Sequence, residues 1–395
     1  GEGGKPFKDA VVEVDRAIDG LNLCAEELRK DGGTVIPMRV NPASAGRLAV
    51  TQFQPIGVVV AVSAFNHPLN LIVHQVGPAV ASGCPVIVKP AKHTPMCAHA
   101  FADILKEAGL PDGWCRVVNT DTTAESEKLV TDPRISFFSF IGSPGVGWSL
   151  KSKLAPGVRC ALEHGGAAPA LVMADADLDL TTSSLLKGGF YHAGQVCVSV
   201  QRIFADEAVA DDLIASLDSQ AANLVVGDPS KPETDVGPLI RPAEVERVDS
   251  WVKEAVDGGA TLVRGGSAIT ERVYEPTILA DPLPDSKIGK QEVFGPVIAV
   301  FRTKSSEEAI ARANSIDFAF QAAVFTQDID NAMAAYSGLN ASAVMVNDHT
   351  AFRTDWMPFA GLGQSGHGVG GIPHTLHDMR IEKMLVVKSP ALENF

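Results

Sequence analysis

Hydrophobic and polar positions follow a helical period near the start of the chain. Over residues 9–29 the apolar residues Val11, Val14, Ile18, Leu21 and Leu28 recur at helical spacing. Asp31-Gly32-Gly33 then stops the pattern, so we expect a helix over 9–29. Two extended stretches follow, TVIPMRV and GRLAVTQF. They predict a two-stranded arm at about 34–53.

From residue 56 onward, apolar β-like runs alternate with helical segments. GVVVAVSAF precedes NLIVHQVGPAVASG, PVIVKP precedes PMCAHAFADILKEAG, and ISFFSFIGS precedes PGVGWSLKSKL. A second series of such units fills about 170–345, and KMLVVK (383–388) reads as a last strand. The alternation predicts an α/β fold with a parallel sheet covered on both faces. Ligands of such sheets bind at the carboxyl ends of the strands.

Composition and charge narrow the classes of function. The chain has 395 residues, 46% of them hydrophobic and 20% charged, which suits two or three globular domains. A formal net charge of −14 argues against a nucleic-acid or anionic-membrane partner. The longest apolar run, 56–65, falls short of the roughly 20 residues that a membrane span needs. Six scattered cysteines without a CxxC pair argue against a metal site or a disulfide framework, and favour the cytoplasm.

Three segments carry candidate chemistry. FIGSPGVG (140–147) follows an apolar strand, and its Ser143 followed by proline predicts a helix start that could bind a phosphate, although a structural turn fits equally well. VIVKP brings Lys89 to the carboxyl end of a strand, where a ribose or phosphate contact competes with a solvated charge. Glu163 precedes two glycines; in an apolar cleft its pKa would rise and it could act as a general base.

Together with the GQVC sequence at 194–197, these pieces resemble the NAD(P)-dependent aldehyde dehydrogenase superfamily. The shared motifs come in the family's order along the chain: AFNHPLN (64–70), KP (89–90), EHGG (163–166), GQVC (194–197), EVFGP (292–296) and PFAG (358–361). The resemblance implies a Rossmann-type cofactor domain, an α/β catalytic domain and a small β oligomerisation arm.

The resemblance assigns roles to three residues. Cys197 would attack an aldehyde carbonyl, and the Asn66 amide with the Cys197 backbone N–H would hold the oxyanion. Glu163 would activate the water that hydrolyses the resulting thioester. Because members that transfer the acyl group to coenzyme A generally lack this glutamate, the resemblance favours a free carboxylic acid as product.

The resemblance also implies a set of cofactor contacts. Lys89 and Glu292 would hold the two riboses, Phe294 would pack near the nicotinamide, and Ser143 would lie near the pyrophosphate. Phe65, Gly142 and Gly165 complete the expected cofactor-binding set. Lys92 stands where many NAD-preferring members have a glutamate, so we expect the protein to accept NADP. A preference for NADP over NAD stays open. The alternative is that Lys92 points to solvent.

The substrate is less defined by the sequence. Arg353 could bind an anionic group of a small aldehyde, with Arg159 as a second candidate. A structural arginine paired with Asp355 or another acid is an equal alternative. His192, where many members have asparagine, could be a structural histidine or a proton shuttle near the substrate. Semialdehydes and phosphorylated or hydroxylated short aldehydes all stay open.

The resemblance further implies the organisation of the chain. We expect a cofactor domain at 1–162, a catalytic domain at 163–362, a return to the cofactor domain at 363–381 and an oligomerisation strand and tail at 382–395. Further N-terminal elements of the family would be missing from the chain. The terminal strand would extend a sheet of a neighbouring subunit in a homodimer or homotetramer.

Three other functions compete with this interpretation. They are a catalytically impaired family member with a structural or binding role, a coenzyme A-acylating dehydrogenase, and a papain-like cysteine hydrolase. The presence of Cys197 and Glu163 argues against the first two, and no papain-like motif surrounds Cys197.

Overall fold

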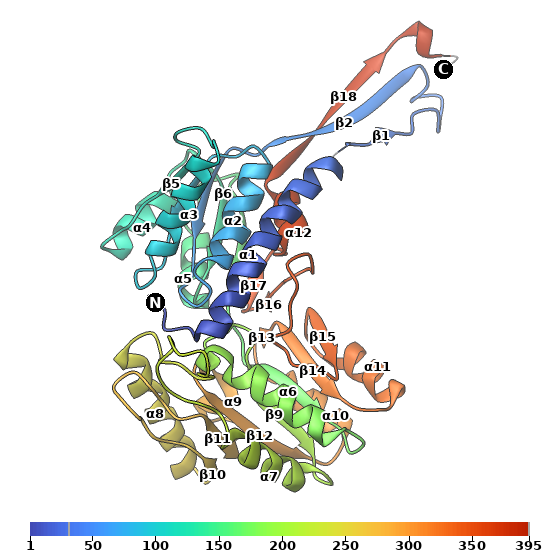
Figure 1. Ribbon diagram of the computed structural model, residues 1–395. Helices are drawn as coiled ribbons and strands as arrows, with labels where there is room; N and C mark the ends of the chain where they lie inside the picture. Colours follow the sequence, from blue (N-terminus) through green and yellow to red (C-terminus); the bar gives the residue numbers. More distant parts are fainter. Residues whose placement is uncertain (31, 394–395) are drawn as a thin grey trace.

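The computed structural model describes residues 1–30 and 32–393. It contains two sheet-centred units stacked on one another, with a thin arm extending from one end (Figure 1). Both units have the parallel α/β architecture that the alternation of strands and helices predicts. Within the described residues, no helix is long and apolar enough to cross a membrane.

The first unit is a six-stranded sheet with the order β17-β7-β6-β3-β4-β5, parallel except for β17. Its strands are β3 (Val58–Val62), β4 (Val86–Lys89), β5 (Cys115–Val117), β6 (Ile135–Ile141), β7 (Arg159–Glu163) and β17 (Gly366–His367). Its helices are α1 (Phe7–Glu27), α2 (Asn70–Ala81), α3 (Met96–Glu107), α4 (Thr123–Val130), α5 (Pro144–Lys151) and α12 (Ile372–Asp378).

Alternate residues of β3 explain why this sheet is covered on both faces. Val59 and Ala61 belong to a buried cluster with residues of α1, α2 and α3, whereas Val60 and Val62 belong to another with residues of α4 and α5. All four side chains are buried. Because successive side chains of a strand point to opposite faces, a continuous apolar strand needs helices on both sides.

The second unit is a seven-stranded sheet with the order β10-β11-β12-β9-β8-β14-β15, in which only β10 runs antiparallel to its neighbour. Its strands are β8 (Ala168–Val172), β9 (Val200–Asp206), β10 (Thr261–Arg264), β11 (Thr277–Ala280), β12 (Val297–Thr303), β14 (Gln321–Phe325) and β15 (Ala343–Val346). Its helices are α6 (Leu178–Phe190), α7 (Ala210–Ala221), α8 (Pro242–Asp257), α9 (Lys287–Lys290), α10 (Ser306–Ala313) and α11 (Ile329–Gly338).

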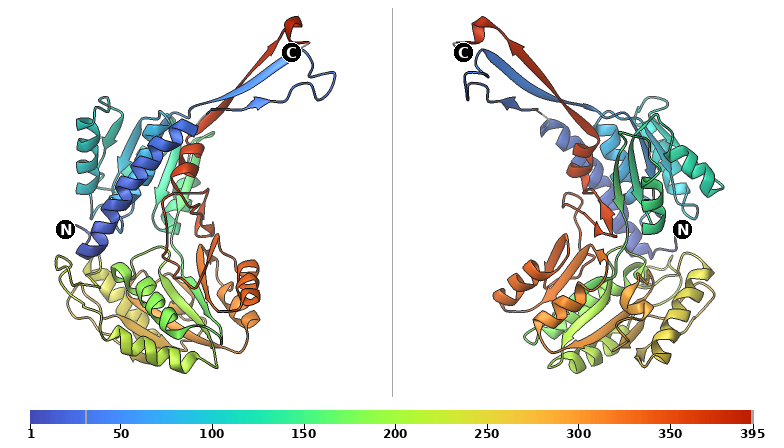
Figure 2. Two further views of the ribbon diagram at one scale, coloured as in Figure 1. Left: turned by 45° about the vertical axis from the view of Figure 1, so that its right-hand side comes forward. Right: turned by 180° about the vertical axis from the view of Figure 1, so that it is seen from behind.

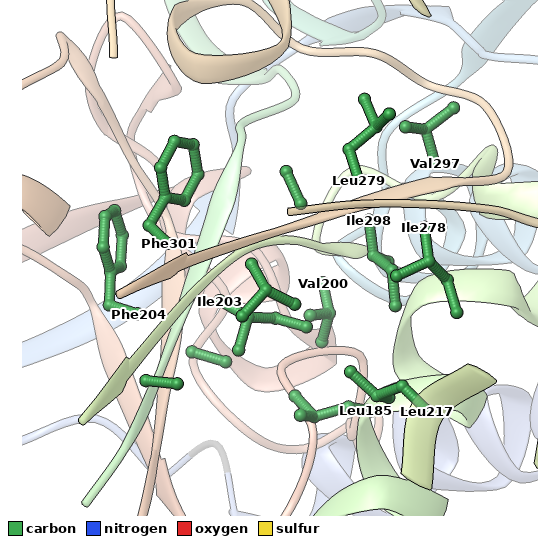
Figure 3. Packing of buried hydrophobic residues seen from close by; sticks show 14 of the residues in the cluster. Leu185, Val200, Ile203, Phe204, Leu217, Ile278, Leu279, Val297, Ile298 and Phe301 are labelled. Atoms are coloured by element: carbon green, nitrogen blue, oxygen red, sulfur yellow. The ribbon is translucent and has the colours of Figure 1, made fainter. Parts of the chain in front are cut away.

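The core of this second unit is one large apolar cluster. Figure 3 shows Ile203 of β9 and Ile298 of β12 on the side of the sheet that faces Leu185 of α6 and Leu217 of α7, whereas Phe301 lies on the opposite side beside Phe204. The short pair β13 (Phe318–Ala319) and β16 (Leu362–Gly363) lies outside both main sheets. Three short 3₁₀ segments complete the chain: η1 (Leu28–Lys30), η2 (Tyr191–Gly194) and η3 (Pro390–Leu392).

The arm is a sheet of three strands, one more than the sequence predicts. β2 (Arg47–Pro55) pairs with β1 (Val35–Ile36) on one edge and, along its whole length, with β18 (Arg380–Lys388) on the other. Figure 2 shows β2 and β18 running out together from the body of the molecule. Sequence proximity suggested only the local pair, because β18 lies more than 300 residues further along the chain.

The predicted first helix is present as α1, but its buried face is not the apolar one. Val11, Val14 and Ile18 are exposed, whereas Glu13, Ala17, Gly20 and Cys24 are buried. Glu13 is buried because its carboxylate accepts the backbone N–H groups of Leu69 and Asn70 at the start of α2. A Cβ added at Gly20 would lie 3.3 Å from Val73, so the small residues let α1 and α2 approach closely. Asp31, part of the predicted stop signal, lies outside the described residues.

Candidate active site

A cavity of about 850 Å³ lies where the two units meet. The first unit contributes residues that directly follow the carboxyl ends of its strands: Phe65 and Asn66 after β3, Lys89 at the end of β4, Gly142 after β6 and Glu163 at the end of β7. The second unit contributes the loop that carries Cys197. This position agrees with the general rule for ligand sites in parallel sheets.

The loop before Cys197 is held in an uncommon backbone conformation. His192, Ala193 and Gly194 are left-handed, with φ values of 48°, 55° and 69°. A Cβ at Gly194 would lie 2.1 Å from the carbonyl oxygen of Gly295, so this position requires glycine. The buried Gln195 amide donates to the carbonyls of His192 and Pro238 at 3.3 Å and accepts the N–H of Ile240 at 2.9 Å. Glycine and glutamine thus fix the loop that presents Cys197.

Cys197 is a free thiol that is largely enclosed by the cavity wall. Burial raises its pKa to about 12, the Arg353 charge opposes that shift, and Glu163 and Glu292 add to it. The backbone N–H of Cys197 interacts with its own sulfur. Asn66 uses one amide N–H to donate to the carbonyl of Gln195 at 3.0 Å, which ties the Asn66 side chain to the Cys197 loop. Its second amide N–H has no acceptor among the described residues and can donate to a bound ligand.

Glu163 ends β7 beside a glycine that makes room for its carboxylate. A Cβ at Gly370 would lie 2.1 Å from Glu163 Oε1. Burial raises the pKa of Glu163, and the Arg353 charge lowers it. A buried carboxyl with a raised pKa has the character of a general base that works near neutral pH.

The cofactor-side residues of the sequence prediction, except Lys92, are brought together in the wall of this cavity. These lining residues are Lys89, Gly142, Ser143, Gly165, Glu292, Phe65 and Phe294. Phe65 and Phe294 meet edge to face with centroids 5.8 Å apart. Glu292 accepts the N–H of Gly166 at 3.1 Å, and burial raises its pKa to about 8. A Cβ at Gly165 would lie 1.6 Å from Glu292 Oε1, so glycine is needed there.

Arg353 lines the same cavity near Cys197 and Glu163, both of which interact with its charge. The alternative that it pairs with Asp355 is wrong: Asp355 binds Arg16 of α1, at 2.6 Å through Nη2 and 3.2 Å through Nε. Arg16 also lines the cavity, and the sequence prediction missed it. Its partner lies 339 residues away, and no local pattern around Arg16 announces that contact.

Three predicted site residues are not brought to the cavity wall. Lys92 is exposed and absent from the lining. Arg159 begins β7, at the opposite end from Glu163, and donates to the carbonyl of Arg380 at 2.9 Å. His192 is buried behind the lining residues His67 and Tyr191, and neither of its ring nitrogens has a hydrogen-bond partner within the described residues. The structure therefore gives no support to substrate contacts by Arg159 or His192.

The sequence and the fold identify the family. The family model for the aldehyde dehydrogenase family matches residues 1–385, so the chain belongs to this family. It is 39% identical over 387 residues to 3-sulfolactaldehyde dehydrogenase of Priestia megaterium, covering 98% of this chain and 80% of the relative. It is 36% identical over 390 residues to lactaldehyde dehydrogenase of Methanocaldococcus jannaschii, covering 98% and 82%.

Solved structures agree with the sequence relatives. Aldehyde dehydrogenase 21 from Physcomitrella patens, in complex with the reaction product succinate, matches with a TM-score of 0.94 at 34% identity, covering 98% of this chain and 80% of that chain. Glyceraldehyde-3-phosphate dehydrogenase GapN from Methanocaldococcus jannaschii, complexed with NADP, matches with a TM-score of 0.92 at 36% identity, covering 98% and 83%. The chain is an oxidoreductase of the aldehyde dehydrogenase type.

Proposed function

We propose that this protein oxidises a small anionic aldehyde to its carboxylic acid, with NAD or NADP as the electron acceptor. One observation carries the proposal: Cys197, Glu163, Asn66 and Arg353 line a single cavity. They supply a nucleophile, a base, an oxyanion donor and a cation for the substrate. The named relatives and solved neighbours act on small aldehydes, which supports the reaction type.

The first step is attack by Cys197. The sulfur adds to the aldehyde carbon, and the thiol proton leaves to a base, for which the nearby Glu163 carboxylate is suited. The free amide N–H of Asn66 and the backbone N–H of Cys197 stabilise the oxyanion of the thiohemiacetal. A bound oxidised nicotinamide would supply the hydride acceptor that the conversion of this thiohemiacetal into a thioester requires.

The cofactor side of the cavity fits a dinucleotide. Lys89 is half-buried at the end of β4 and can donate to ribose hydroxyls. Ser143 precedes α5, whose first backbone N–H groups favour a phosphate. The Glu292 carboxyl, anchored by Gly166, can bind a second ribose, and the Phe65–Phe294 pair offers an apolar wall for a flat ring. Both cofactors occur among the solved neighbours, as NADP in GapN and by name in an NAD-dependent enzyme from Sinorhizobium meliloti.

The second step is hydrolysis of the thioester. After the thiol proton has passed from Glu163 to solvent, Glu163 takes a proton from water and the resulting hydroxide adds to the acyl carbon. The Cys197 thiolate then leaves with release of the acid and recovers a proton from Glu163. The raised pKa of Glu163 strengthens it as a base, and its burial limits the water that competes for it. The presence of this carboxyl favours a free acid over transfer to coenzyme A.

An anionic substrate is supported by the charges at the cavity. Arg353 brings a guanidinium close to Cys197, and Arg16, which pairs with Asp355, also lines the cavity. Relatives and neighbours are named for or solved with sulfonated, phosphorylated or carboxylated compounds. A planar guanidinium can bind any of these groups through two parallel hydrogen bonds.

A matched pair of aldehydes tests the proposal. 3-Sulfolactaldehyde and lactaldehyde differ only by the sulfonate, as glyceraldehyde 3-phosphate and glyceraldehyde differ by the phosphate. We expect kcat/KM to be about tenfold or more higher for the anionic member of at least one pair, because a charge-assisted bond is gained. Arg353→Met should bring that ratio close to one. Equal kcat/KM values for both members of each pair in the unchanged protein would show that the substrate is not selected by charge.

A further inference from the structure

Within the described residues Arg353 forms no hydrogen bond or ion pair with a carboxylate, although the charges of Glu163 and Asp355 act on it from a longer distance. Its Nη2 lies 3.3 Å from Nδ1 of His74, and its Cζ lies 3.6 Å from the centre of the Phe359 ring. Its Nε has no hydrogen-bond partner within residues 1–30 and 32–393. The two groups in direct contact with this guanidinium are therefore an imidazole and an aromatic face, and neither carries a negative charge.

His74 is itself fixed from its other side. Its Nε2 lies 2.6 Å from Oδ1 of Asp355, and the imidazole is almost completely buried in α2. Asp355 also accepts from both Arg16 and Asn70. Burial acts to raise the pKa of its carboxyl, but the hydrogen bonds from His74 and Arg16 outweigh it and lower that pKa. An ionised carboxylate can only accept, so Nε2 of His74 must carry the hydrogen.

This assignment leaves one role for Nδ1. Burial, together with the charge of Arg353, lowers the pKa of His74 to about 4, so the ring is neutral at pH 7. With Nε2 protonated, Nδ1 has a free lone pair that faces Nη2 of Arg353. One tautomer thus satisfies both neighbours of the ring.

We propose that His74 is a positioning residue for substrate recognition, whose Nδ1 lone pair aims the Arg353 guanidinium at the anionic end of the aldehyde and leaves its charge available. A carboxylate in place of Nδ1 would hold the arginine equally well but would compensate its charge. A protonated imidazole would repel it. The inference rests on the proposed function, since it concerns how the substrate anion is selected.

Two substitutions separate the two contacts of the ring. In His74→Gln, the amide nitrogen can reach the place of Nε2 and keep the bond to Asp355, but no acceptor remains at the place of Nδ1. In His74→Asn, the amide oxygen can occupy the place of Nδ1 and keep the acceptor, but the bond to Asp355 is lost. Gln75→Leu is the matched control: Gln75 is the next residue of α2, is buried, and donates to Ser139 and Val62.

The readout is kcat/KM for the anionic and neutral members of the aldehyde pair that the unchanged protein discriminates. We expect His74→Gln to reduce kcat/KM for the anionic aldehyde about tenfold, mainly through KM, with the neutral aldehyde changed by less than about twofold. His74→Asn should keep the ratio of the two kcat/KM values within about threefold of the unchanged protein. Gln75→Leu should lower the Tm and leave this ratio unchanged.

An equal loss for both aldehydes in His74→Gln, or an unchanged ratio, would overturn the inference and leave His74 a purely structural residue. If His74→Gln does not fold, His74→Asn decides, because a complete loss of the ratio there would contradict a role of the Nδ1 acceptor. The two proposals fail in different ways. If the unchanged protein shows no preference for the anionic aldehyde, the anionic-substrate proposal fails. If Arg353→Met abolishes this preference but His74→Gln keeps it, only the role of His74 is refuted.

Discussion

At the scale of single residues, burial disfavours the charged forms of the two reacting groups of the cavity. It raises the pKa of the Cys197 thiol and of the Glu163 carboxyl, and each anion would disfavour the other. The Arg353 charge is the one group that lowers both pKa values by attraction. The same guanidinium that we assign to substrate binding therefore also supports ionisation of the nucleophile and the base.

The thiol pKa predicts how Cys197 reacts with iodoacetamide. Because the pKa is about 12, the thiolate fraction and the alkylation rate should rise about tenfold for each pH unit between pH 7 and 10. Arg353→Met removes a cation and should slow alkylation at every pH in this range. Mass spectrometry of the peptide that contains Cys197 follows the reaction, and the unfolded protein gives the profile of an ordinary thiol. A rate that levels off below pH 8 would contradict the raised pKa.

A second prediction at the scale of single residues concerns Gly370, which makes room for the Glu163 carboxylate. Since an added Cβ would lie 2.1 Å from Glu163 Oε1, Gly370→Ala should displace the carboxylate and reduce kcat roughly 100-fold, the loss expected when a general base is removed. Stopped-flow measurement of cofactor reduction should give the same time course for Gly370→Ala as for Glu163→Gln. Gly227→Ala is the control, because its Cβ would meet no heavy atom within 4 Å. Unchanged steady-state turnover in Gly370→Ala would show that Glu163 is not held as described.

At the scale of elements, the site is made by strand ends that point to the same edge of a sheet. β3, β4, β6 and β7 run parallel, so the residues after them reach the cavity together although they are separated by up to about 100 positions along the chain. The periodicity predicts these strands, and the rule for parallel sheets then predicts where the ligand binds. The position of this part of the site can therefore be predicted from the strand pattern alone.

Other parts of the site could not be predicted from the sequence. The contacts that join Arg16, His74 and Asp355 span 339 and 281 positions, and nothing near any of the three residues signals them. The apolar spacing in α1 predicts a helix but gives no hint that Glu13 is buried, because its partners are backbone groups of α2. Local periodicity carries information on elements, whereas long-range polar contacts depend on how the elements pack.

The segment between β4 and α3 is where we expect the preference between NADP and NAD to be set. Lys92 lies there, exposed and outside the cavity lining, so its charge would act on a 2′-phosphate through solvent. If it does, Lys92→Glu should raise the Kd for NADP roughly fivefold and change that for NAD by less than about twofold. Calorimetry measures both constants, with Lys106→Glu on α3 as a control for a distant exposed charge. Equal effects of the two substitutions on NADP binding would show that Lys92 points to solvent.

At the scale of the whole molecule, the arm stands apart from the two compact units. In Figure 2, β2 and β18 extend well beyond the helices of the first unit. On β18, Met384 and Val386 are 56% and 45% exposed, and the alternate residues Leu385 and Val387 are 59% and 40% exposed. Because alternate residues face opposite sides, both faces of this ribbon are apolar and bare in a single chain. Contiguous apolar surface of this kind marks an interaction site.

We therefore predict that the protein associates through the arm into a homodimer or a homotetramer. Light scattering after size exclusion should give at least twice the 41.5 kDa of one chain. The double substitutions Met384→Glu with Val386→Glu, and Leu385→Glu with Val387→Glu, each place two charges on one face, and at least one pair should yield the monomer. Ile104→Glu, at a residue of α3 that is 57% exposed, is the control and should keep the assembly. A monomer from the unchanged chain would refute association, and an assembly that survives both pairs would place the contact elsewhere, since burying unpaired carboxylates is too costly for an intact interface.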